Sequence, residues 1–80
     1  MTAPETVRQA VAMALRGIAP EADIDQIEPG ASLREQLDLD SFDFLQLLIA
    51  LQQALGVDIP EADYARVDSL SALVAYLAAA

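Results

Sequence analysis

The sequence predicts an all-α fold, a small bundle of three longer helices and one short helix in one domain spanning residues 1–80. Three stretches place apolar residues at helical spacing, and capping residues, prolines and a glycine separate them. No stretch has the alternating pattern of a strand. Because 55% of the residues are hydrophobic, a chain of 80 residues can still bury a core.

The first helix is expected to begin at a capping box formed by Thr2 and Glu5, with Pro4 in the first turn. Pro20 should end this helix by Ala19. One face carries an apolar stripe made of Val7, Val11, Ala14, Leu15 and Ile18. This stripe needs partner helices to cover it.

A long connection, residues 20–40, follows the first helix. A connection of this length inside a small domain usually carries structure or function of its own. Ser32 and Glu35 form a second capping-box pattern, which predicts a short helical turn over residues 33–37. The apolar side chains expected to anchor the connection to the core are Ile24, Ile27, Leu33 and Leu37.

The central helix should run from Ser41 to Leu55 and end at Gly56. Asp40 suits its N-cap, because a carboxylate accepts hydrogen bonds from the amides of the first turn and complements the helix dipole. Asp43, at the third helical position, can act as the acidic partner of this cap. Ser41 then lies at the first helical position, with its hydroxyl near the surface.

Two apolar sectors share the central helix. The first is wide enough to face a core and contains Phe44, Leu47, Leu48, Leu51 and Leu55. The second flanks Ser41 and contains Phe42, Leu45 and Ile49. Two interpretations of the second sector stay open, and both can hold in part: it is a second buried side of a central helix, or it is an exposed apolar docking surface.

The C-terminal part should contain one very short and one longer helix. A short link, residues 57–60, leads into the short helix over residues 60–65, with Pro60 near its start. Asp68 or Ser69 should cap the last helix. Its apolar side chains repeat at helical spacing at Leu70, Leu73, Val74 and Leu77.

Charge and residue types restrict the possible functions. Thirteen acidic and four basic residues give a net charge of −9, which disfavours nucleic acid and favours a basic protein partner. No apolar run approaches the ~20 residues of a membrane span, and no signal-peptide pattern opens the chain, so we expect a cytoplasmic location without membrane insertion. The chain contains no Cys, His or Lys, and therefore lacks a thiol nucleophile, a Schiff-base amine, the usual general base and imidazole or thiolate metal ligands. We expect neither enzyme activity nor a metal site.

The sequence resembles the acyl carrier protein family, also called phosphopantetheine-binding carrier proteins, over nearly its whole length. The family signature is an Asp-Ser-Leu tripeptide that opens the second helix before a leucine-rich stretch. Here Asp40-Ser41-Phe42 precedes Leu45, Leu47 and Leu48, and Ile59-Pro60 follows where carriers place an equivalent. The tripeptide alone is weak evidence, but the tripeptide, the leucines, the Ile-Pro pair and the length together are specific.

The resemblance implies a monomeric, non-enzymatic carrier with the acyl-carrier four-helix fold. A phosphopantetheinyl transferase would attach the 4′-phosphopantetheine of coenzyme A to Ser41, next to Asp40, which would make the chain a phosphoprotein. An acyl group would then ride on the thiol of this arm and pass between acyl-transferring or synthase enzymes. The residue types agree, because Ser41 has no base of its own and the chain has no thiol.

The resemblance also implies roles for the residues around Ser41. The residues expected to dock partner enzymes are Phe42, Asp43, Leu45, Gln46 and Ile49, and those expected to line an acyl pocket are Phe44, Leu48 and Leu51. Carriers of fatty acid biosynthesis usually have several Glu along this helix, where Gln46 and other neutral residues stand here, which indicates a specialised pathway. Phe44 replaces a usually smaller residue, so it is either a core residue or a plug that shortens the pocket. Asp38 stands where the family often has Gly.

Three alternatives accompany this interpretation. The chain could carry aminoacyl or peptidyl groups, or it could be an interaction bundle that keeps the fold and is never modified. Asp68-Ser69-Leu70 also matches the literal tripeptide, but only ten residues follow it, which leaves no room for the later helices of a carrier. Ser69 is therefore expected to be a plain helix cap.

Overall fold

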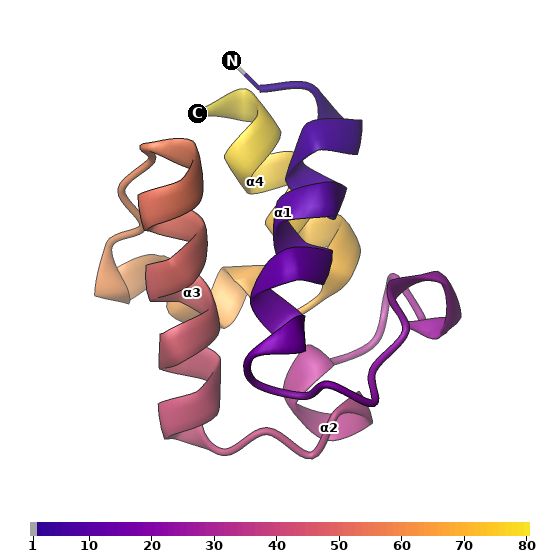
Figure 1. The fold of residues 1–80 in the computed structure, drawn as a ribbon. Helices are drawn as coiled ribbons and strands as arrows, with labels where there is room; N and C mark the ends of the chain where they lie inside the picture. The colour runs from indigo at the N-terminus through magenta and orange to yellow at the C-terminus, as the bar shows by residue number, and fades with distance from the viewer. Residues whose placement is uncertain (1) are drawn as a thin grey trace.

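In the computed structural model, which describes residues 2–80, three longer helices surround one core (Figure 1). They are α1 (Pro4–Arg16), α3 (Ser41–Leu55) and α4 (Leu70–Ala79). Three shorter helices connect them: η1 (Ile24–Gln26), α2 (Leu33–Gln36) and η2 (Glu61–Val67). Residues 2–80 form no strand, and their one extended pairing is an isolated antiparallel bridge between Ser32 and Ser69. The predicted all-α class is confirmed.

The start of α1 differs from the prediction. Ala3, not Thr2, is the N-cap residue, its backbone is extended, and no side chain caps the helix there. The predicted capping box of Thr2 and Glu5 is therefore wrong. Steric clash with a proline ring disfavours helical backbone in the preceding residue, so Ala3 stays outside the helix and Pro4 becomes its first residue.

The end of α1 also comes earlier than the limit set by Pro20. The helix ends at Arg16, and the backbone amides of Ile18 and Ala19 fold back onto the carbonyl of Leu15 at 3.1 and 2.7 Å. Ala19 is buried and Ile18 packs against the core from this turn. The predicted apolar stripe holds, but its last member belongs to a turn rather than to the helix.

One cluster of buried apolar side chains joins all the long helices. α1 packs against both α3 and α4, and α4 also packs against η2. The largest fully buried side chains are Leu33, Leu47, Leu48, Leu51, Leu70, Leu73 and Leu77. The long connection is anchored as predicted, since Ile27 and Leu33 are buried while Ile24 and Leu37 pack against the cluster.

The short helix η2 is longer than predicted and is tied to α4. It runs two residues beyond the expected end and buries Val67 in the core. The Tyr76 hydroxyl donates a hydrogen bond to Asp63 Oδ2 at 2.8 Å, which links α4 to η2. This hydrogen bond raises the pKa of the Tyr76 phenol above its ordinary value, because ionisation would break it.

Candidate functional site

The candidate site is built at the N-terminus of α3. Asp40 is its N-cap, and Asp40 Oδ1 accepts a hydrogen bond from the backbone N–H of Asp43 at 2.7 Å. Ser41 is the first helical residue and is exposed, and its hydroxyl takes part in no hydrogen bond within residues 2–80. At the other end Gly56 adopts the left-handed conformation with φ 67. The predicted bounds and both caps of this helix are confirmed.

The loop that leads into the site contains a strained residue. Asp38 has a φ of 54, the one positive φ of a non-glycine residue within residues 2–80. This left-handed conformation favours glycine, and Asp is among the few other residues that adopt it at moderate cost. The turn lets the Leu39 amide donate to the Arg34 carbonyl at 2.9 Å and buries the Leu39 side chain. The loop therefore delivers Asp40 to the start of α3 in a defined orientation.

Two clefts meet at Ser41, and both also include Arg34. The first, which we call the η2 cleft, has a volume of about 570 Å³, and its walls include Arg34, Ser41, Phe44, Glu61 and Tyr64. The second, the α2 cleft, has a volume of about 580 Å³, and its walls include Arg34, Glu35, Asp38, Asp40, Ser41 and Asp68. A group attached to Ser41 can therefore lie in either of two clefts, and Arg34 lines both of them.

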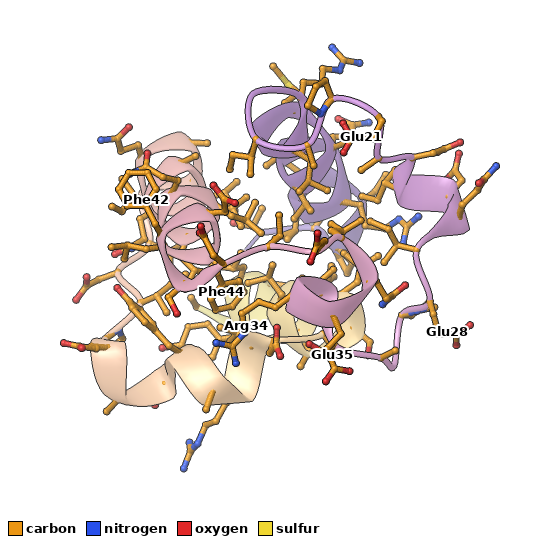
Figure 2. All side chains as sticks on the ribbon, turned by 90° about the horizontal axis from the view of Figure 1, so that it is seen from below. Glu21, Glu28, Arg34, Glu35, Phe42 and Phe44 are labelled. Carbon is orange, nitrogen blue, oxygen red and sulfur yellow. The ribbon has the colours of Figure 1, made fainter. Side chains whose placement is uncertain are left out.

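Sequence reasoning missed Arg34. Its guanidinium carbon lies 5.1 Å from the centroid of the Phe44 ring, and its Nε lies 3.4 Å from Asp68 Oδ1. Figure 2 shows Arg34 and Phe44 together between α3 and α2. The surrounding sequence signals only a capped helical turn, and no motif distinguishes this arginine. Contacts with distant segments identify it.

The second apolar sector of α3 is exposed. Phe42 is 65% exposed and Ile49 is 36% exposed, while Leu45 is half-buried. Figure 2 shows Phe42 pointing away from the bundle, whereas Phe44 lies on its inner side. Of the remaining residues expected to dock partners, Asp43 is half-buried and Gln46 is exposed. Each of the two interpretations of this sector therefore holds in part, with Phe42 and Ile49 exposed and Leu45 partly covered.

The three residues expected to line an acyl pocket do not share a cleft. Phe44 is 4% exposed and forms part of the wall of the η2 cleft. Leu48 and Leu51 are fully buried in the core and border neither cleft at Ser41. The structure therefore brings Phe44 to the site and leaves the two leucines in the core, outside the clefts.

The second Asp-Ser pair has a different arrangement. Ser69 is the N-cap of α4, and its hydroxyl accepts a hydrogen bond from the backbone N–H of Ala72 at 3.2 Å. Asp68 Oδ2 accepts a hydrogen bond from the Ser32 hydroxyl at 2.7 Å. Ser69 is the plain helix cap that the sequence predicts.

No group of three or more Cys, Asp or Glu side chains gathers as a metal site within residues 2–80. None of the helices formed by these residues combines the length and apolar character needed to cross a membrane.

Comparisons with known proteins show which family this chain resembles. A family model described as a phosphopantetheine attachment site matches residues 5–77. The chain is 33% identical to the acyl carrier protein of Rubrobacter xylanophilus over 55 residues, which cover 69% of this chain and 68% of that protein. It is 28% identical to the acyl carrier protein of Helicobacter hepaticus over 57 residues, 71% of this chain and 75% of that one. The structure of an acyl carrier protein from Enterococcus faecalis superposes with a TM-score of 0.81 at 22% identity, covering 98% of both chains, which shows a common fold.

Proposed function

The chain belongs to the acyl carrier protein family, and from this membership we propose that it carries acyl groups as thioesters on a phosphopantetheine arm attached to Ser41. Members of the family are carriers rather than enzymes, and their prosthetic group is covalently bound phosphopantetheine. The attachment residue, the cargo and the docking surface are the parts of the function proposed here.

The main support for this proposal is the Ser41 hydroxyl, which makes no hydrogen bond within residues 2–80. It is exposed at the first position of a capped helix. The amides and dipole at a helix N-terminus favour an anion, which suits the phosphodiester that attachment would create. The hydroxyl and its two adjacent clefts therefore fit the arm, whereas the Ser69 hydroxyl is already used as a cap.

The side chains around Ser41 have separate tasks. Asp40 holds the first turn of α3 so that the Ser41 hydroxyl faces outward. The chain has no His, Lys or Cys, so the base that activates Ser41 must come from a separate phosphopantetheinyl transferase. The bound arm supplies a terminal thiol, which holds the acyl group. The chain itself contributes a fixed attachment point and surfaces for partner enzymes.

The packing of Phe44 supports short or polar cargo. Its ring is almost fully buried, forms part of the wall of the η2 cleft and belongs to the same core cluster as the fully buried Leu48 and Leu51. A ring at this position fills volume that a smaller side chain would leave open to an acyl chain. Longer chains would therefore stay outside the bundle, in the η2 cleft or on a partner enzyme.

The exposed sector of α3 supports docking through apolar contacts. Phe42 and Ile49 are exposed beside the attachment residue, Leu45 lies between them, and Gln46 offers a neutral polar contact. Asp43 supplies charge only near the arm. We assign this surface to the transferase and to the acyl-transferring or synthase enzymes of a specialised pathway, which this monomeric carrier would serve in the cytoplasm.

Intact-mass spectrometry after incubation with coenzyme A and a phosphopantetheinyl transferase tests the attachment. We expect one added arm on the wild type, none on Ser41→Ala, and one on the matched control Ser69→Ala. An arm that persists on Ser41→Ala would refute Ser41 as the attachment residue. No addition to the wild type with several transferases would favour an unmodified interaction bundle.

A further inference from the structure

The charges around Ser41 are unevenly distributed. Acidic side chains dominate the walls of the two clefts: Glu35, Asp38, Asp40, Glu61 and Asp68. Within residues 2–80, Arg34 is the one cationic side chain in those walls, on a chain of net charge −9. A negatively charged group on Ser41 would be repelled by these carboxylates, whereas Arg34 and the amides at the start of α3 would attract it. Among the described residues, Arg34 is therefore the one side chain in these walls whose charge attracts such a group.

The guanidinium of Arg34 is held in place before any ligand arrives. Asp68 Oδ1 accepts a hydrogen bond from the Arg34 backbone N–H at 3.3 Å and lies 3.4 Å from its Nε. The other oxygen of Asp68 accepts from the Ser32 hydroxyl at 2.7 Å, which fixes the carboxylate in turn. On its other side the guanidinium lies over the Phe44 ring. Asp68 and Phe44 are thus positioning residues for Arg34.

The Nε of Arg34 faces Asp68, but the N–H donors on its two terminal nitrogens remain available. A guanidinium has five N–H donors in a planar fork, and none of them makes a hydrogen bond of good geometry to an acceptor within residues 2–80. Attraction to the face of Phe44 uses the positive charge but provides no oxygen acceptor. A guanidinium whose N–H donors lack acceptors is suited to bind an oxyanion. Phosphate fits best, because the guanidinium can bind it through two parallel hydrogen bonds.

We propose that Arg34 binds the phosphodiester that joins the arm to Ser41 and so directs the arm into the η2 cleft. The proposal rests on the attachment to Ser41 proposed above. Arg34 borders both clefts, but four of the five acidic side chains belong to the α2 cleft and only Glu61 to the η2 cleft. Repulsion by those four carboxylates and contact with Phe44 and Tyr64 both favour the η2 cleft. A carboxylate at the end of a cargo offers the same oxyanion chemistry, so the test must separate the two sources.

The test uses the apo and arm-bearing full chain, with mass spectrometry establishing the state of each sample. In the wild type, addition of the arm should shift the Arg34 Nε–H resonance and leave that of Arg16 in place, because Arg16 is exposed and borders neither cleft. The arm should also raise the melting temperature by roughly 4 °C, since the contact exists only in the folded state. Arg34→Gln should abolish this rise, and Arg34→Lys should keep part of it, because a lysine has the charge without the fork.

Arg16→Gln is the matched control, since it removes the same charge elsewhere and should keep the full rise. The ³¹P resonance of the arm should move in Arg34→Gln and stay in Arg16→Gln. An unchanged Arg34 resonance on addition of the arm, with an equal rise in melting temperature in Arg34→Gln, would overturn the proposal.

A second comparison uses the protein with a succinyl or a butanoyl group on its arm. These two acyl groups differ in one terminal carboxylate. If Arg34 responds only to the succinyl group, it binds the cargo and not the phosphodiester, and the proposal is wrong. If mass spectrometry finds no arm on Ser41, the proposed attachment itself fails, which is a result distinct from an arm without an Arg34 response.

Discussion

The chain contains two helix starts of nearly identical sequence, Asp40-Ser41 and Asp68-Ser69, and they use their residues differently. At α3 the aspartate is the cap, so the serine is the first helical residue and its hydroxyl stays exposed. At α4 the cap lies one residue later, so the serine hydroxyl accepts from the Ala72 amide. The aspartate before it binds Ser32 and Arg34 instead.

A shift of one residue in the cap thus decides whether a serine hydroxyl is structural or available for chemistry. The shift has a tertiary cause at α4. The carbonyl of Asp68 accepts from the Leu33 amide at 2.6 Å, and Ser32 and Ser69 form an antiparallel bridge. These contacts hold Ser69 itself in an extended conformation, with φ −124 and ψ 155, so the helix begins only after it. No comparable backbone bridge restrains Ser41 within residues 2–80.

The largest expected effect concerns the side chain that anchors the start of α3. Phe44→Ala should lower the free energy of unfolding by about 3–5 kcal/mol, because it opens a cavity in the core beside the attachment site. An octanoyl group on the arm should then recover part of this loss by filling the space. Melting temperatures of the holo and octanoyl forms test both statements. If octanoyl stabilises the wild type as much as Phe44→Ala, the ring is not a plug.

The next largest effect contrasts the two aspartates. Asp68→Ala should cost about 2 kcal/mol, because it removes hydrogen bonds from Ser32 and Arg34 to a charged, partly buried acceptor. Asp40→Ala should cost only about 1 kcal/mol, the usual value for an N-cap. Urea unfolding of both variants measures the difference. An equal or larger loss of unfolding free energy in Asp40→Ala would show that Asp68 does not contribute more to stability than Asp40.

The two serines should differ by a smaller amount in their contribution to stability. Ser69, which is not expected to be modified, should matter more for folding than Ser41, the proposed attachment residue. Ser69→Ala removes a capping hydroxyl and should cost about 1 kcal/mol. Ser41→Ala removes an exposed hydroxyl without a partner and should change the free energy of unfolding of the apo chain by less than about 0.5 kcal/mol. Urea unfolding of the apo proteins checks the pair. A stability loss in Ser41→Ala equal to that in Ser69→Ala would mean that Ser41 is a structural residue too.

The smallest expected effect is that of salt on partner binding next to Ser41. Exposed charge pairs are screened by salt, whereas apolar contacts such as those offered by Phe42, Leu45 and Ile49 are not. The affinity for a cognate acyl-transferring enzyme should therefore change less than about threefold between low and physiological ionic strength. Phe42→Ala should weaken binding at both salt concentrations. A steep loss of affinity with salt in the wild type would show that acidic residues carry the docking.

Local chemistry lets the amino-acid sequence alone define most helices of this chain. Asp40 and Gly56 delimit α3 correctly, and Ser32 marks α2, because a cap depends on groups within about four residues along the chain. Helical spacing identifies the buried leucines for the same reason. The local prediction fails at Thr2, because Pro4 restricts Ala3 to extended backbone and moves the helix start.

What the sequence could not supply are the contacts between segments far apart along the chain. Whether Phe42 and Ile49 are covered, and what Arg34 faces, both depend on how the helices close around the core. Asp68 and Arg34 are separated by 34 residues, and no propensity or periodic pattern spans such a distance. The serine suited to modification is therefore visible in the sequence, while the arginine beside it appears only when the folded chain brings residues 34, 44 and 68 together.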